Sequence, residues 1–161
     1  MKEIYLVGGC FWGLEAYFKL LKGVIDTDVG YANGNKKNPK YEELKQGKAT
    51  HAETVKIVYD DSKLTLYKIL DAFMEVIDPY SINKQGNDEG LQYRSGIYLT
   101  NESELSKVKE YIANKENELN KGKFVIEISL LQNYYSAEEY HQDYLDKNPS
   151  GYCHINLNKY R

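Results

Sequence analysis

The residue most suited to chemistry is Cys10, which lies between an apolar segment ending in Gly8-Gly9 and an amphipathic helical pattern. Backbone amides in the first turn of a helix have no partner within it, and together with the helix dipole they favour an anion. A thiol at such a position is expected to become a thiolate more easily and to act as a nucleophile. The alternative is a buried cysteine that acts only as a small apolar residue, and the local pattern leaves both open.

Two aromatic residues, Phe11 and Trp12, follow this cysteine directly. They could wall a small apolar pocket beside a reactive thiol, or they could simply belong to the core. The other cysteine is Cys153, far away in the sequence. Two cysteines are too few for a disulfide scaffold or a four-cysteine zinc site, so inert core thiols or redox chemistry are the expected roles.

The composition is typical of a globular domain of ordinary size. The chain has 161 residues, of which 42% are hydrophobic and 28% are charged. The formal net charge of −3 argues against a nucleic-acid partner held by a basic face. Apolar runs are too short for a membrane-spanning helix, and the N-terminus lacks a signal-peptide pattern. We therefore expect a protein of the reducing cytoplasm.

Hydrophobic periodicity predicts the elements that would position these residues. Strands are predicted at 4–7, 24–31, 53–59, 93–99 and 124–130. Helices are predicted after Cys10, from Ser62 to Pro79, after Asn101, and from Ser136 to about Lys147. Asn101 and Ser136 each precede a glutamate by three residues, which is the pattern of a capping box. Polar loops are predicted at 33–48, with one helical turn at 41–45, and at 81–92.

The order of these elements predicts an α+β fold, a two-layer α/β sandwich with helices on one face of a mixed sheet. We expect a ferredoxin-like core and an irregular C-terminal tail after Gly151. No repeat, low-complexity tract or linker interrupts the chain, so residues 1–161 are expected to form a single catalytic domain.

Five motifs occur in order along the chain: Gly9-Cys10-Phe11-Trp12-Gly13, His51-Ala52-Glu53, Asp78-Pro79 followed by Gln85 to Ser95, Tyr140 to Leu145, and Asn148 to Cys153. The third is long and highly specific. Together they resemble the signature of the A-type peptide methionine sulfoxide reductases, and the resemblance covers nearly the whole chain. One departure is Thr50, which stands where the family usually has glycine.

The resemblance implies an oxidoreductase that converts methionine S-sulfoxide, free or in a protein, to methionine and so repairs oxidised proteins. The implied reductant is thioredoxin. No cofactor, metal, nucleic acid or membrane is implied, and we expect a monomer.

By the same resemblance, Cys10 attacks the sulfoxide sulfur and Glu53 protonates the sulfoxide oxygen, which is otherwise a poor leaving group. Glu53 begins a predicted strand beside apolar residues, and desolvation at such a place raises the pKa of a carboxyl. Taken alone, Glu53 could equally be an exposed charge at a strand end. Phe11 and Trp12 would hold the S-methyl group of the substrate.

Three further residues are assigned to the substrate site by the resemblance. Tyr41 and Tyr93 match family tyrosines that orient the sulfoxide oxygen, and a phenol can donate to charge that develops there. Nothing local selects these two among 16 tyrosines, so the motifs around them carry the assignment. Asp88 matches a family aspartate of the site; it also suits an Asx turn, and both roles are compatible.

The resemblance assigns the second redox step to Cys153. Once Cys10 has become a sulfenic acid, a second thiol must form a disulfide with it. Cys153 follows Gly-Tyr on the predicted irregular tail, and thioredoxin would then reduce the Cys10–Cys153 disulfide. The tail lacks the glycine-rich extension with a third cysteine that some members have, so one resolving cysteine is expected. A bystander thiol is the alternative.

Neither the histidines nor two alternative functions fit the sequence as well as a thiol-dependent reductase does. His51 and His141 lack a third ligand at suitable spacing, so structural hydrogen bonds are expected rather than a metal site, and His154 has no expected role. A peroxidase could use the same Cys10, but peroxide has no methyl group for the aromatic pair to hold. A module that binds methionine sulfoxide without turnover would be expected to lack Glu53 or Cys153, and both are present.

Overall fold

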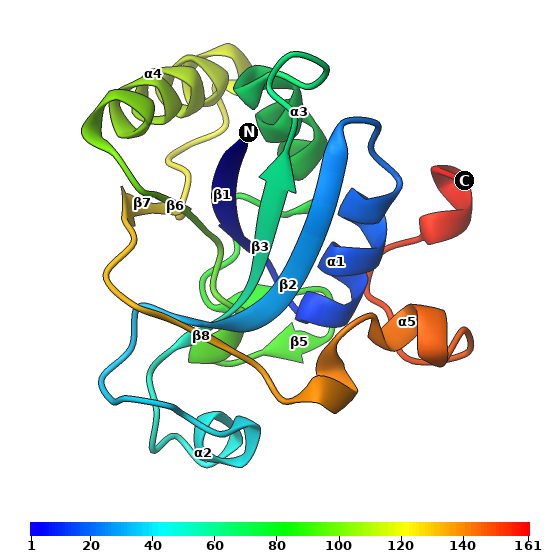
Figure 1. Cartoon of the computed structure of the whole chain (residues 1–161). Coiled ribbons are helices and arrows are strands. Elements are labelled where there is room, and N and C mark those ends of the chain that lie inside the picture. Colours follow the sequence, from blue (N-terminus) through cyan, green and yellow to red (C-terminus); the bar gives the residue numbers. More distant parts are fainter.

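The computed structural model describes residues 1–161 and has a mixed α+β fold (Figure 1). The main sheet has six strands in the order β7-β6-β1-β3-β2-β8, and only β6 and β7 are parallel neighbours. These strands are β1 (Lys2–Val7), β2 (Val24–Ala32), β3 (Ala52–Tyr59), β6 (Gly96–Leu99), β7 (Glu127–Leu130) and β8 (Tyr134–Ser136). A separate small hairpin is formed by β4 (Lys84–Gln85) and β5 (Asp88–Glu89). The helices are α1 (Phe11–Lys19), α2 (Tyr41–Lys45), α3 (Leu66–Val76), α4 (Glu102–Leu119) and α5 (Tyr144–Lys147).

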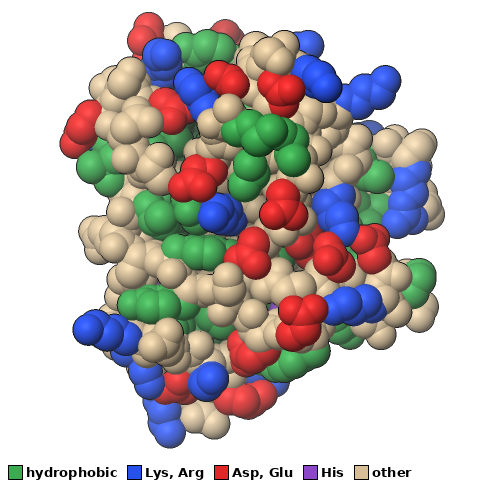
Figure 2. Space-filling view, in the orientation of Figure 1, with side chains coloured by type: hydrophobic (Ala, Val, Ile, Leu, Met, Phe, Trp, Pro, Cys, Tyr) green, Lys and Arg blue, Asp and Glu red, His purple; other side chains and the backbone are tan.

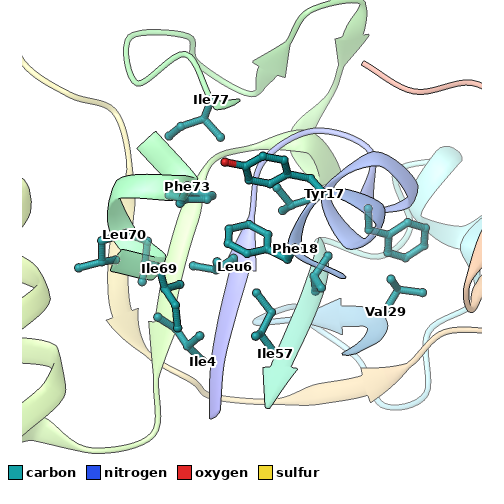
Figure 3. Packing of buried hydrophobic residues seen from close by; sticks show 14 of the residues in the cluster. Ile4, Leu6, Tyr17, Phe18, Val29, Ile57, Ile69, Leu70, Phe73 and Ile77 are labelled. Carbon is teal, nitrogen blue, oxygen red and sulfur yellow. The ribbon is translucent and has the colours of Figure 1, made fainter. Parts of the chain in front are cut away.

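The main core lies between one face of the sheet and the helices α1, α3 and α4. Side chains alternate along β1, so Ile4 and Leu6 both point into this core. Figure 3 shows Phe18 of α1 and Phe73 of α3 beside Leu6, and all three are fully buried. Burial of each such side chain contributes about 1.5–3 kcal/mol, so this layer fixes α1 on the sheet. The predicted α+β sandwich with a mixed sheet is confirmed.

The other face of the sheet carries a smaller buried cluster, made of Tyr5, Val7, Ala32, Ala52 and Tyr98. Tyrosine suits this face because its ring is apolar and its hydroxyl can reach a polar partner. The hydroxyl of Tyr5 donates to Glu3, and that of Tyr98 donates to Glu127. Part of the tyrosine content therefore serves the sheet.

The helix starts agree only in part with the predicted caps. Asn101 caps α4 as predicted, because its side-chain oxygen accepts from the backbone amide of Glu104 at 2.9 Å. Helix α3 begins after Thr65, whose hydroxyl oxygen caps it, and not after Ser62. The hydroxyl of Ser62 instead donates to Asp60 at 2.6 Å.

The predicted helix from Ser136 to Lys147 is wrong. Ser136 ends strand β8, which pairs with β2, and its hydroxyl donates to Asp28 at 2.8 Å. A 3-10 turn at Glu139–His141 follows, and only then the short helix α5. Long-range strand pairing has overridden the local capping pattern at this point.

The predicted loop 81–92 is more ordered than expected. It contains the β4–β5 hairpin and leads into a 3-10 turn at Leu91–Tyr93. Gln85 holds the hairpin in place, since its Nε2 donates to the hydroxyl of Ser95 at 2.9 Å. Tyr93 consequently lies in the turn and not in the predicted strand, which begins at Gly96.

The tail after α5 has no regular structure except a 3-10 turn at Leu157–Lys159, and it packs against α1. In Figure 1 this segment, coloured orange to red, passes beside α1. Figure 2 shows basic and acidic side chains interspersed over the visible face, in keeping with the small net charge. None of the helices combines the length and apolarity needed to cross a membrane.

Candidate active site

Cys10 is held at the start of α1, in the turn that follows β1. It is the N-cap residue of the helix, and its backbone amide donates to Oδ2 of Asp88 at 3.2 Å. The preceding Gly9 has a φ of 78°, a left-handed conformation that a side chain would strain. Cys10 is only 6% exposed. The turn therefore presents the sulfur inside the protein, tied to the β4–β5 hairpin through Asp88.

Glu53 lies on β3 beside the same turn and is 1% exposed. Its Oε1 accepts from the backbone amide of Phe11 at 3.3 Å, and its Oε2 accepts from Nε2 of Gln92 at 3.4 Å. Burial raises the pKa of this carboxyl to about 8, although both hydrogen bonds act to lower it. Glu53 therefore holds a proton at neutral pH and is not an exposed charge at a strand end.

The surroundings of Cys10 differ from the expectation of an easily formed thiolate. Burial raises the pKa of the thiol, and Glu53 raises it further once it has lost its own proton. The backbone amide of Trp12 in the first turn lowers the pKa but does not outweigh burial. The prediction that Cys10 easily becomes a thiolate is therefore wrong for the protein without substrate. The sequence shows that the cysteine precedes a helix, but it does not show how strongly the folded chain shields the sulfur from water.

Tyr41 and Tyr93 come from separate elements and lie near each other and Glu53. Tyr41 opens α2, where its backbone amide donates to Glu138 at 3.2 Å. Burial raises the pKa of Tyr41 to about 12, with further contributions from Glu53 and Cys10, and a hydrogen bond with Tyr93 acts in the opposite direction. Burial also raises the pKa of Tyr93. Both phenols keep their protons and remain hydrogen-bond donors.

The two aromatic residues after Cys10 differ in their surroundings. Phe11 is fully buried in the core, and Trp12 is half-buried. The indole of Trp12 stacks on Tyr144, with ring centroids 3.8 Å apart and planes within 10°. Its Nε1 donates to Nδ1 of His141 at 2.9 Å. The orientation of the Trp12 ring is therefore fixed by two residues of the C-terminal region.

His141 makes a structural hydrogen bond, as predicted, because its Nδ1 is the acceptor for Trp12. Replacing His141 with phenylalanine keeps a ring but removes this acceptor. We expect the free energy of unfolding to fall by about 1–3 kcal/mol, measured by urea denaturation. Replacing it with glutamine offers an acceptor again and should restore part of the loss. An unchanged urea midpoint in His141→Phe would show that the bond contributes nothing.

His51 also has a structural position. Its ring is fully buried, and a hydrogen bond with the backbone of Lys36 raises the pKa of the imidazole against the effect of burial. A Cβ built on Gly34 would lie 2.1 Å from the His51 ring, so the imidazole fills the space that this glycine leaves open. The structure has no group of three or more His, Cys, Asp or Glu side chains arranged to hold a metal ion.

The C-terminal segment brings Cys153 to the same end of α1 as Cys10. Both cysteines are free thiols. A Cβ built on Gly13 would lie 2.8 Å from Sγ of Cys153, which places that sulfur against the first turn of the helix. His154, which sequence analysis left without a role, faces Asp88, with 3.6 Å between Nδ1 and Oδ2. Its position directly after Cys153 is the one signal that could have singled it out.

This arrangement combines a soft nucleophile, a protonated carboxyl and two phenolic donors. The carboxyl and phenols can stabilise an oxygen atom that leaves another atom, while the thiol attacks that atom. A second thiol nearby can then regenerate the first through a disulfide. The arrangement is therefore suited to reductive removal of oxygen by sulfur.

Comparison with known proteins agrees with this chemistry. The family model described as "Peptide methionine sulfoxide reductase" matches residues 2–161. The chain is 54% identical over 154 residues to "Peptide methionine sulfoxide reductase MsrA" of Lachnoclostridium phytofermentans, covering 96% of this chain and 92% of that one. The reduced form of Mxr1 from Saccharomyces cerevisiae is similar with a TM-score of 0.88 and 36% identity, covering 94% of this chain and 88% of that one. Methionine sulfoxide reductase A of Corynebacterium diphtheriae has a TM-score of 0.88 and 39% identity, with coverage of 94% and 77%. The chain thus belongs to the peptide methionine sulfoxide reductase family.

Proposed function

We propose that the protein reduces methionine S-sulfoxide, free or within proteins, to methionine, and so repairs oxidised proteins. The observation that carries this proposal is the buried carboxyl of Glu53, whose pKa is raised to about 8, beside the thiol of Cys10. A sulfoxide oxygen leaves only when it is protonated, and Glu53 holds the required proton at neutral pH.

In the first step, the sulfur of Cys10 attacks the sulfoxide sulfur while Glu53 gives its proton to the oxygen. Tyr41 and Tyr93 donate hydrogen bonds to that oxygen as charge develops on it. The bond between sulfoxide sulfur and oxygen breaks as a sulfur–oxygen bond forms on Cys10. The thiol proton of Cys10 replaces the proton that Glu53 gave. Methionine leaves, and the net result is a sulfenic acid on Cys10. The electron pair that reduces the substrate comes from Cys10. The apolar contact for the substrate methyl group is assigned to the aromatic residues Phe11 and Trp12.

In the second step, Cys153 attacks the sulfenic sulfur of Cys10, a disulfide forms and the oxygen leaves as water. An external dithiol must then reduce the disulfide, and we assign this role to thioredoxin. This assignment has support from Mxr1, whose reduced form is similar to this chain and which has been solved in complex with Trx2.

The proposal also covers the domain organisation, the oligomeric state and the cellular compartment of the protein. We infer a single catalytic domain over residues 1–161 that works as a monomer in the reducing cytoplasm, without a metal or organic cofactor. The support comes from the proposed cycle, which uses both cysteines of the chain as thiols, and a reducing compartment keeps thiols available for such chemistry.

The test uses purified protein with a racemic mixture of methionine S-sulfoxide and R-sulfoxide, and dithiothreitol as reductant. Chiral chromatography follows each epimer separately. The expected result is loss of the S epimer alone. Loss of neither epimer by folded protein with reduced thiols would overturn the proposed reaction, and loss of the R epimer alone would overturn its stereochemistry.

Replacing Cys153 with serine is expected to separate the two steps. The variant should still release one equivalent of methionine, because Cys10 and the residues around Glu53 are intact. It should then stall when thioredoxin is the reductant, because no disulfide can form. The measurement is methionine release over time with thioredoxin, thioredoxin reductase and NADPH. Thioredoxin-driven turnover at the wild-type rate would exclude Cys153 as the resolving cysteine.

A further inference from the structure

We propose that His154 is a positioning residue for the disulfide-forming step. It anchors the C-terminal segment against Asp88 and the start of α1, and it thereby holds Cys153 in place to attack the oxidised Cys10. This inference rests on the proposed function, because it concerns the second step of that reaction.

The His154 side chain is buried within a segment that is otherwise partly exposed. It is 4% exposed, whereas Tyr152 and Asn156, two residues before and after it, are exposed. Ile155 and Leu157 are the apolar residues of the segment that are buried.

The Nδ1 of His154 faces Oδ2 of Asp88 at 3.6 Å, and a hydrogen bond with the backbone of Gly8 also acts on the ring. Gly8 lies two residues before Cys10. Both contacts therefore join the C-terminal segment to the turn that carries the reactive cysteine.

Two glycines, Gly9 and Gly13, leave open the space that the His154 ring occupies. A Cβ on Gly9 would lie 2.8 Å from Nε2 of His154, and a Cβ on Gly13 would lie 3.2 Å from its Nδ1. The same Cβ on Gly13 would lie 2.8 Å from Sγ of Cys153. Gly13 is inside α1, where glycine is less stable than alanine by about 0.5–1 kcal/mol. The absence of a side chain there is what allows the ring and the thiol to reach the helix.

Asp88 connects this anchor to the reactive cysteine. Its Oδ2 accepts from the backbone amide of Cys10 at 3.2 Å and faces His154 at 3.6 Å. Because His154 is the residue directly after Cys153, its contact with Asp88 limits how far Cys153 can move from Cys10. The thiol of Cys153 donates to the carbonyl of Ile155 at 3.1 Å, which orients the sulfur in the reduced protein. The segment is thus held ready for an intramolecular reaction.

The step that this anchor serves is balanced in atoms and electrons. The sulfur–sulfur bond forms as the sulfur–oxygen bond of the Cys10 sulfenic acid breaks. The proton of the Cys153 thiol leaves with the hydroxide as water. Cys153 is oxidised, and the sulfenic sulfur of Cys10 is reduced. Such a step depends on keeping the reacting groups close together, so release of the segment should slow it without changing its chemistry.

The experiment compares His154→Ala and His154→Gln with the wild type, and Asn158→Ala serves as a control on an exposed residue of the same tail. Each protein, fully reduced, receives one equivalent of methionine S-sulfoxide without external reductant. Quenched samples are analysed for methionine by chromatography, for sulfenic acid by dimedone labelling, and for disulfide by mass spectrometry after alkylation.

We expect methionine to form at a similar rate in all four proteins. Disulfide formation should slow by about tenfold or more in His154→Ala, with a longer-lived sulfenic acid, because the anchored geometry is lost. His154→Gln should recover part of the rate, since its amide can donate to Asp88, and Asn158→Ala should match the wild type. A role confined to folding would not produce this separation of steps or this rescue.

Two results would overturn the inference: disulfide formation at the wild-type rate in His154→Ala, or equal slowing of methionine and disulfide formation. Absence of methionine in the wild type would instead refute the proposed function. If His154→Ala fails to fold by circular dichroism, His154→Phe decides, because it keeps a ring in the same space but has no nitrogen to face Asp88. It should show the same slow disulfide step, and a wild-type rate in it would refute the anchor.

Discussion

Replacing Cys10 with serine is expected to abolish methionine formation. A serine hydroxyl is a poor nucleophile at its ordinary pKa, and the reaction needs a sulfur that can accept the oxygen. The site should otherwise persist, because the contact with Asp88 is made by the backbone amide of Cys10 and not by its sulfur. The measurement is methionine released in a single turnover with one equivalent of methionine S-sulfoxide.

The matched control is Cys153→Ser, which removes a thiol and leaves Cys10 in place. Circular dichroism and urea denaturation establish that both variants are folded. Methionine release by Cys10→Ser at a rate comparable to the wild type would rule out Cys10 as the nucleophile.

Replacing Glu53 with glutamine is expected to slow the methionine-forming step by about 10²–10⁴-fold, the usual contribution of a general acid. Glutamine keeps an oxygen that can accept from the Phe11 amide, so the geometry should survive.

The pH dependence of the reaction gives a second test of Glu53. Its carboxyl pKa is raised to about 8, which means that the proton is present below this pH and lost above it. Burial also raises the pKa of the Cys10 thiol, so the reactive thiolate fraction grows with pH. The wild-type rate should therefore rise with pH up to about 8 and level off above it as Glu53 loses its proton, whereas the rate of the variant should go on rising.

The measurement is the single-turnover rate of methionine release from pH 6 to 10, made on both proteins by rapid quench. Alkylation of Cys10 by iodoacetamide provides the control, since a folded Glu53→Gln protein keeps an alkylatable thiol. A variant that retains the wild-type rate and the same levelling above about pH 8 would exclude Glu53 as the proton donor.

The fold could be predicted from the sequence where a periodic pattern is long. The apolar run of β1, the alternation along β3, the helical spacing in α1 and the cap at Asn101 were sufficient for those elements. Strand β8 could not be predicted, because three residues show no period and their pairing depends on the distant β2. The error at Ser136 has the same cause: a local capping pattern is weak, and a sheet edge competed with it.

The sequence indicated which residues lie together at the candidate site, but it did not indicate how the fold shifts their pKa values. Motif order indicated Cys10, Glu53 and Cys153, and the structure places all three around the start of α1. The direction of the Cys10 pKa shift was not predictable, since it depends on how much of the tertiary structure covers the sulfur. The contact of Gln92 with Glu53 and that of His154 with Asp88 were not predicted, because each joins residues that are far apart along the chain.

The burial of Cys10 affects how long the protein stays active while no substrate is bound. Oxidants and electrophiles dissolved in the surroundings attack thiolates that they can reach. A cysteine that is 6% exposed and whose thiol keeps its proton is a slow target for such reagents. A protein that repairs oxidative damage works where these reagents accumulate, and its own nucleophile is the residue whose loss would inactivate it. The same cover that makes the resting thiol unreactive therefore extends the working life of the molecule under oxidative stress.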